Sequence, residues 1–116
     1  NALYVSAVSL GWRYLACGAM SATAEALRYL NCMQESTAAY LSVVELAASA
    51  GLVKLAADAK YNLAIVLHED GRADAACAKM AEACADYEVM KDADSAQDAR
   101  SSIAKWLGRT GNSGGE

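Results

Sequence analysis

The strongest constraint on the fold is a sequence pattern that occurs twice, forty residues apart. Asp58–Gly71 reads DAKYNLAIVLHEDG, and Asp98–Gly111 reads DARSSIAKWLGRTG. Both segments fit D-A-[KR]-x-x-[LI]-A-x-x-L-x-x-x-G. The apolar and small positions recur every three or four residues, as on one face of a helix, and glycine commonly follows a helix C-terminus. The repeat therefore predicts similar helical units that occur in succession along the chain.

The composition supports an all-α fold. Hydrophobic residues make up 55 % of the 116 residues, aromatic residues only 7 %, and proline is absent. Alanine is the best helix former and proline the worst, so this composition favours closely packed helices. We expect one helical-repeat domain over residues 1–108, followed by a flexible, glycine-rich tail over 109–116. Because the sequence starts at Asn1 rather than Met, a segment of a longer array is an alternative interpretation.

Breaker residues divide the chain into about six predicted helices. Gly18, Gly51 and Gly71 are expected to end three of them, and Ser95 with Asp98 resembles a capping box at the start of the last. The predicted helices lie near 3–17, 21–33, 36–50, 54–69, 72–88 and 95–108. The connections are short, so consecutive helices should form antiparallel hairpins.

Small side chains are expected at the contacts between these helices. Ala64, Ala76, Ala83 and Ala104 lie on the apolar faces of the predicted helices. A small side chain allows the backbone of a second helix to come close. The helices 54–69, 72–88 and 95–108 are therefore predicted to nest against one another as consecutive neighbours.

The charge excludes one class of partner. The net charge is −4, the pI is about 4.9, and the ten basic residues are scattered along the chain. Proteins that bind nucleic acid need a basic face to neutralise phosphates. We therefore expect no nucleic-acid partner.

The cysteines indicate neither a metal site nor a disulfide framework. Cys17, Cys32, Cys77 and Cys84 form no C-x-x-C pair, and the single histidine completes no recognisable zinc quartet. Within one straight helix, Cys77 and Cys84 would lie about 10 Å apart along the axis, too far for a disulfide. Free thiols in a reducing intracellular compartment, the cytoplasm or an organelle interior, are the interpretation, with no metal or cofactor.

Residues 2–24 form the most apolar stretch, with Arg13 as its only charge. A central arginine and several serine, threonine and glycine residues disfavour a membrane span. The stretch also lacks the positive start of a signal peptide. A buried helical hairpin is the prediction for this segment, and contact with a membrane surface is the alternative.

The segment DAKYNLAIVLHEDGRADAACAKMAEACADY resembles the tetratricopeptide repeat, a helix-turn-helix unit of about 34 residues. The expected slots are occupied by Leu63, Ala64, Leu67, Ala76, Met80 and Ala83. The forty-residue spacing is most similar to the longer kinesin-light-chain type of repeat. The resemblance covers 57–88 best, with weaker matches over 98–111 and 6–18. Lys60 stands in the family's aromatic slot and Glu88 in its proline slot, and both depart from the family pattern.

The resemblance implies a short α-solenoid whose first helices line a concave groove for a peptide or helix of another protein. On this basis Tyr61, Asn62, Ile65 and His68 should face the groove, with Ser101 and Ser102 added by the following repeat. Asn62 suits the recognition of a peptide main chain because an amide both donates and accepts hydrogen bonds. Arg100 is the candidate cation for a peptide carboxylate.

We expect a non-enzymatic interaction module or scaffold that forms part of a larger complex. His68 is followed by Glu69 and Asp70, but adjacent helical residues point about 100° apart, so they form no preformed catalytic dyad. The alternative is a small helical structural subunit of a larger assembly, lying against a membrane through residues 2–24. Such a subunit should expose apolar patches well beyond those of an ordinary monomer.

Overall fold

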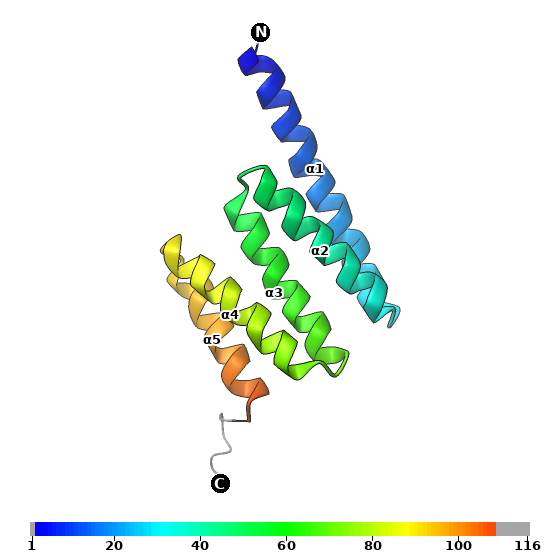
Figure 1. Ribbon diagram of the computed structural model, residues 1–116, viewed down its shortest axis with the longest axis vertical. Helices are drawn as coiled ribbons and strands as arrows, with labels where there is room; N and C mark the ends of the chain where they lie inside the picture. Colours follow the sequence, from blue (N-terminus) through cyan, green and yellow to red (C-terminus); the bar gives the residue numbers. More distant parts are fainter. Residues whose placement is uncertain (1, 109–116) are drawn as a thin grey trace.

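The computed structural model describes the backbone of residues 2–108 and the side chains from residue 9 onward. The described chain forms five helices: α1 (Ala2–Tyr29), α2 (Met33–Ser49), α3 (Val53–Glu69), α4 (Ala73–Val89) and α5 (Ala93–Trp106). Each helix packs against the next as an antiparallel neighbour (Figure 1). The expected all-α stack of helical hairpins is confirmed, as is the succession of α3, α4 and α5. The predicted tail, 109–116, lies outside the described residues.

The turns repeat every twenty residues. Asn31, Gly51, Gly71 and Lys91 all have positive φ angles, between 62° and 82°. After each of them, the N–H group of the next residue donates to the carbonyl five residues back, at 2.8 or 2.9 Å. This pairing satisfies carbonyls that a helix C-terminus leaves free. The same turn therefore reverses the chain each time, and it fixes the forty-residue hairpin seen in the sequence.

Two predicted helix boundaries are wrong. Gly18 lies inside α1, which runs unbroken from Ala2 to Tyr29, so five helices form where about six were expected. A glycine costs a helix only about 1 kcal/mol relative to alanine, and the residues after it pack against α2. At α5 the cap is Asp92, whose side chain accepts a hydrogen bond from the Ser95 N–H at 3.2 Å.

The core contains many small residues, as predicted. Ala64, Ala76 and Ala83 have no exposed surface, and the larger Leu63 and Met80 fill the space beside them. These residues belong to clusters that join α3 to both of its neighbours. Ala104, at the repeat position of Ala64, is only half-buried because no helix among the described residues covers that side of α5. The helix contact predicted at Ala104 is therefore only partly made.

The first half of α1 is the exception to this packing. It extends past the end of α2 (Figure 1), so Trp12 is 70 % exposed and Leu15 is 64 % exposed. The buried hairpin predicted for residues 2–24 is wrong, since this segment is one helix with an exposed side. Within residues 2–108, no helix combines the length and apolarity needed to cross a membrane.

All four cysteines are free. Cys17 and Cys84 are buried, whereas Cys32 and Cys77 are partly buried. Burial raises the pKa of the Cys17 thiol, which keeps it protonated and of low reactivity. Cys17 and Cys84 are therefore small core residues, as the sequence predicted, whereas Cys32 and Cys77 lie at the edge of the core.

Candidate protein-binding groove

A concave surface of the stack lies between α3 and α5. It consists of two successive hollows along the two helices, which together we call the α3–α5 groove. The first hollow, of about 310 Å³, is lined by Asp58, Tyr61, Asn62, Tyr87, Ser95 and Asp98. The second, of about 450 Å³, is lined by Ile65, His68, Glu69, Ser102, Lys105 and Trp106.

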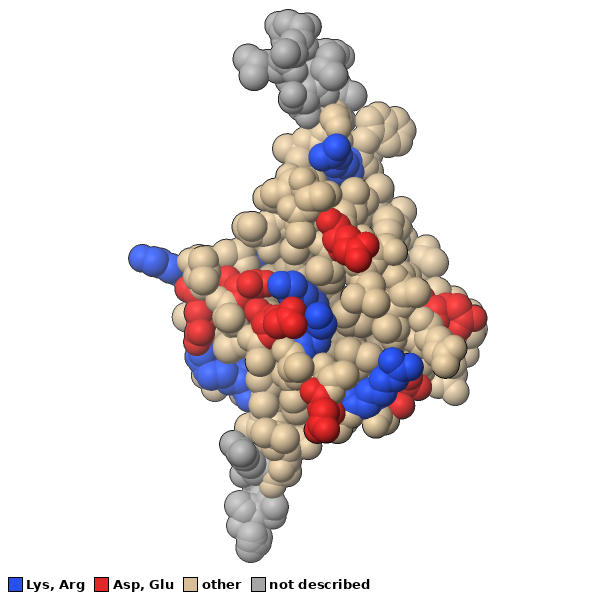
Figure 2. Space-filling view, in the orientation of Figure 1, with Lys and Arg blue, Asp and Glu red and all other residues tan. Residues whose placement is uncertain are grey.

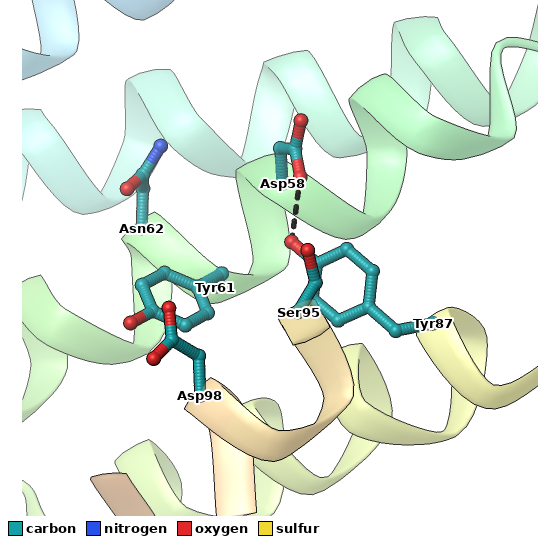
Figure 3. Close-up of a pocket in the computed structure, with 6 residues that line it drawn as sticks. All are labelled: Asp58, Tyr61, Asn62, Tyr87, Ser95 and Asp98. Carbon is teal, nitrogen blue, oxygen red and sulfur yellow. Dashed lines mark hydrogen bonds between the residues drawn. The ribbon is translucent and has the colours of Figure 1, made fainter. Parts of the chain in front are cut away.

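Three helices contribute side chains to the first hollow (Figure 3). Tyr61 from α3 lies beside Asp98 from α5, and Asn62 extends away from them. Tyr87 from α4 is buried beside Asp58 and Ser95, and it forms the floor of that part of the hollow. The floor is fixed because the Tyr87 hydroxyl donates a hydrogen bond of 2.6 Å to Asp58 Oδ1. Burial, and then the Asp58 carboxylate, raise the pKa of Tyr87, so its hydroxyl stays a neutral donor.

Lys54 ties α3 to the start of α5 at the edge of this hollow. Its ammonium lies 2.8 Å from Asp92 Oδ2 and 4.9 Å from the centre of the Tyr87 ring. The hydrogen bond from Lys54, together with that from Ser95, lowers the pKa of Asp92 to about 2. The bond to Asp92 also raises the pKa of Lys54. The wall formed by α5 is therefore held in place by a charged contact and a helix cap together.

Two side chains in the first hollow are available for a ligand. Asn62 is half-buried and Asp98 is exposed. Within the described residues, neither side chain hydrogen-bonds to another part of the chain. An amide offers donors and an acceptor, and a carboxylate offers acceptors only. The hollow therefore presents unused hydrogen-bonding groups above a rigid aromatic floor.

The second hollow is organised by a stacked pair of rings. The centroids of His68 and Trp106 lie 4.5 Å apart, and the ring planes are 10° from parallel. Trp106 also packs against both adjoining core clusters, so it anchors the end of α5 against α3. Beside it, Arg28 of α1 binds Glu69 through two hydrogen bonds of 2.8 and 2.7 Å. The bond from Arg28 lowers the pKa of Glu69.

The structure brings together four of the six predicted partner-binding residues. Tyr61, Asn62, Ile65 and His68 all line the α3–α5 groove, and Ser102 joins them from α5. This agrees with their expected placement on one side of a first helix.

Arg100 and Ser101 lie elsewhere. They line a different hollow on α5 with Gln97, Ala104 and Lys105. Arg100 lies 2.6 Å from Glu88 Oε2 and also contacts Gln97, so its charge is directed toward α4. Arg100 and Ser101, which were expected to face the groove, therefore do not line it. Ser102, predicted together with Ser101, does.

Sequence reasoning missed two residues of the groove. Tyr87 reaches the floor from α4, and Trp106 closes the second hollow from the end of α5. The sequence held one signal for Trp106: it lies at the repeat position of Val66, where an aromatic residue is a departure. Asp58 and Asp98 open the two copies of the repeated pattern, and both line the first hollow.

Within the described part of the chain, no three histidine, cysteine, aspartate or glutamate side chains come together as a metal site would require. Comparisons of the chain with protein-family models, curated proteins and solved structures find no match. The resemblance to tetratricopeptide repeats therefore remains a prediction that rests on the residues quoted above.

Proposed function

We propose that this chain is a non-enzymatic interaction module that holds a peptide or helix of a partner protein in the α3–α5 groove. The observation that carries the proposal is the convergence of Tyr61, Asn62, Ile65 and His68 on one concave surface. These residues combine aromatic area, an aliphatic side chain and unused hydrogen-bonding capacity. Peptide sites need apolar contacts for affinity and a few polar groups to fix orientation.

The groove is also preorganised, which favours binding. The Tyr87–Asp58 hydrogen bond, the Lys54–Asp92 ion pair and the stacking of His68 on Trp106 hold its floor and both walls. A rigid site loses less conformational entropy when it binds a partner. Four free thiols further support a reducing intracellular compartment as the place where this module works.

The test is partner recovery by the intact chain compared with point variants. Asn62→Ala removes an unused amide from the first hollow, and Ser102→Trp fills the second hollow from α5. We expect each to lower the recovery of the same partner about tenfold, the effect of losing roughly 1.4 kcal/mol of binding free energy. Gln34→Ala is the matched control, since it removes an exposed amide outside the groove.

The readout is quantitative pull-down followed by titration of the recovered partner. Circular dichroism should show that all variants keep the wild-type helix content. Undiminished binding by both groove variants would reject the groove as the binding site. Equal loss with Gln34→Ala would do the same, because the effect would then not be specific to the groove.

A further inference from the structure

The outer side of α1 carries an uncharged stripe that nothing in the described structure covers. Its residues recur with the alternating spacing of three and four that marks a two-helix interface. They are Trp12, Leu15, Ala19, Ala22, Ala26 and Tyr29, and all six are exposed. The opposite side of α1 packs against α2 through Cys17 and Ala24, both fully buried. The stripe therefore lies on a second side of α1, separate from the side that packs against α2.

We propose that this stripe pairs with the same stripe of a second copy, forming an antiparallel, two-fold symmetric dimer through α1. The proposal is independent of the groove and goes beyond the function proposed above. A two-fold interface requires one surface that is complementary to itself.

The order of side chains in the stripe meets that requirement. With two α1 helices antiparallel and centred between Ala19 and Ala22, each Ala19 lies opposite the Ala22 of the other copy. Leu15 then meets Ala26, so a large side chain faces a small one. Trp12 meets Tyr29 at either end, where two aromatic rings close the interface. The small central residues allow the two backbones to approach closely, and the large residues bury most of the area.

The positions beside the stripe allow this arrangement. In the same register, Ala16 lies near Thr23 of the other copy, and Gly18 lies near Glu25. No like charges meet at these flanking positions. Gly18 has open space around its Cα, with no atom within 4 Å of where a Cβ would stand. The continuity of α1 through Gly18 is what makes the stripe long enough for two helices to pair.

The exposed area is sufficient for a reversible dimer. Trp12, Leu15 and Tyr29 are 70 %, 64 % and 73 % exposed. With about 150–250 Å² for each aromatic side chain, and the three alanines added, each copy offers on the order of 500 Å². Two copies bury about 1,000 Å², near the lower bound for a specific interface. We therefore expect a modest affinity and an equilibrium between monomer and dimer.

The polar outer side of α5 disfavours a head-to-tail assembly, in which α5 of one copy would pack on the α1 stripe of the next. The outer side of α5 carries Gln97, Arg100, Ser101 and Lys105, which are exposed and polar. Pairing this face with the stripe on α1 would remove these polar and charged groups from water against an apolar surface, which costs free energy. In Figure 2 charged side chains gather over the lower part of the molecule, and few lie along α1. The apolar face that suits the stripe is the stripe of another copy.

Sedimentation equilibrium of the full chain tests the proposal. We expect the apparent mass to rise with concentration from 12.1 kDa to twice that value and no further. Ala19→Glu places two carboxylates at the centre of the interface and should weaken dimerisation at least about tenfold. Ala22→Glu is a second, independent variant of the same kind. Ala81→Glu, on the exposed side of α4, is the matched control and should dimerise normally.

A paired substitution tests the direction of the helices. In Ala19→Glu with Ala22→Lys, an antiparallel dimer brings each glutamate opposite a lysine of the other copy, so dimerisation should return. A parallel pair would bring glutamate against glutamate, and dimerisation would stay lost. Failure of the double variant to recover would overturn the antiparallel register.

Two other results would overturn the proposal. The first is a wild-type chain that stays monomeric up to millimolar concentration, or one that grows beyond a dimer. The second is sedimentation of the monomer with vesicles of phosphatidylcholine and phosphatidylserine, abolished by Ala19→Glu, which would make a membrane surface the occupant of the stripe. Circular dichroism should show that each variant keeps its helices, since exposed glutamate is a good helix former.

Discussion

The two ends of this stack present opposite surfaces, although both are helices that pack in the same way against a neighbour. On α1 the outer side carries the exposed Trp12 and Leu15. On α5 the equivalent outer region carries Gln97, Arg100 and Ser101, with Arg100 paired to Glu88. A polar outer face ends a repeat array, because a terminal helix needs a side that tolerates water. Among the described helices, α5 therefore has an outer side that tolerates water, whereas the outer side of α1 is suited to a further helix.

The largest expected effect contrasts a buried leucine with an exposed one. Leu63, in the centre of the stack, is 1 % exposed, and Leu15, on α1, is 64 % exposed. Leu63→Ala should lower the free energy of unfolding by about 3 kcal/mol, since it removes buried methyl groups and leaves a cavity. Leu15→Ala should change it by less than about 0.5 kcal/mol in dilute monomer. Urea denaturation of both variants measures the difference, and similar losses would contradict the view that α1 is open.

The next effect compares the same repeat position inside the stack and at its end. Ala64 is fully buried, whereas Ala104 is half-buried on the uncovered side of α5. Ala64→Leu should destabilise the fold by about 2 kcal/mol, because it forces α3 and α4 apart. Ala104→Leu should cost less than about 0.5 kcal/mol. Thermal melts of the pair provide the check, and an equal cost at both positions would show that a helix covers α5.

A third experiment gives the polar outer side of α5 the residues that stand at the same repeat positions of α3. Gln97→Ala, Ser101→Tyr and Lys105→Ile give α5 the residues that α3 carries forty positions earlier. This change removes the polar side chains from the outer face and exposes new apolar area. We expect association at α5, read as an increase in sedimentation mass beyond any dimer formed through α1. An unchanged mass would mean that the polar side chains are not what ends the stack.

The smallest expected effect is on the stability of the fold at low pH. An ion pair holds each end of the stack to α3, and its carboxylate is protonated in acid. Arg28–Glu69 holds α1 and Lys54–Asp92 holds α5, and both carboxyl pKa values are lowered. A lowered folded-state pKa stabilises the fold above the unfolded value, near 4 for these carboxyls. That stabilisation is lost as the pH falls through the folded value, about 2 for Asp92.

Asp92→Asn removes the titrating carboxyl group at the α5 end and leaves the Arg28–Glu69 pair at the α1 end unchanged. It should make the stability at the α5 end less dependent on pH between about 4 and 2, while Arg28–Glu69 continues to respond. Acid unfolding followed by circular dichroism measures this change in slope. An acid transition identical to that of the wild type would show that the Lys54–Asp92 pair does not stabilise the fold.

The candidate groove was partly predictable. The residues of α3 that face it, Tyr61, Asn62, Ile65 and His68, were assigned from the resemblance to the tetratricopeptide repeat. The apolar pattern of the helix agrees with that assignment, because it fixes which side is buried and which side remains. The residues of α5 could not be placed reliably, since a shift of one position turns a side chain by about 100°. Of the three residues assigned to it from α5, only Ser102 lines the groove, whereas Arg100 and Ser101 line a different hollow.

The sequence by itself determined the helical class, the turns at Gly51 and Gly71, and the burial of Ala64, Ala76 and Ala83. Each of these follows from local rules: helix propensity, the left-handed freedom of glycine, and the close approach that small side chains allow. Only the tertiary structure decided that Gly18 continues α1 while Lys91, at φ 62°, ends α4. Packing decided both cases, because contacts with neighbouring helices contribute more free energy than the roughly 1 kcal/mol preference of a single residue.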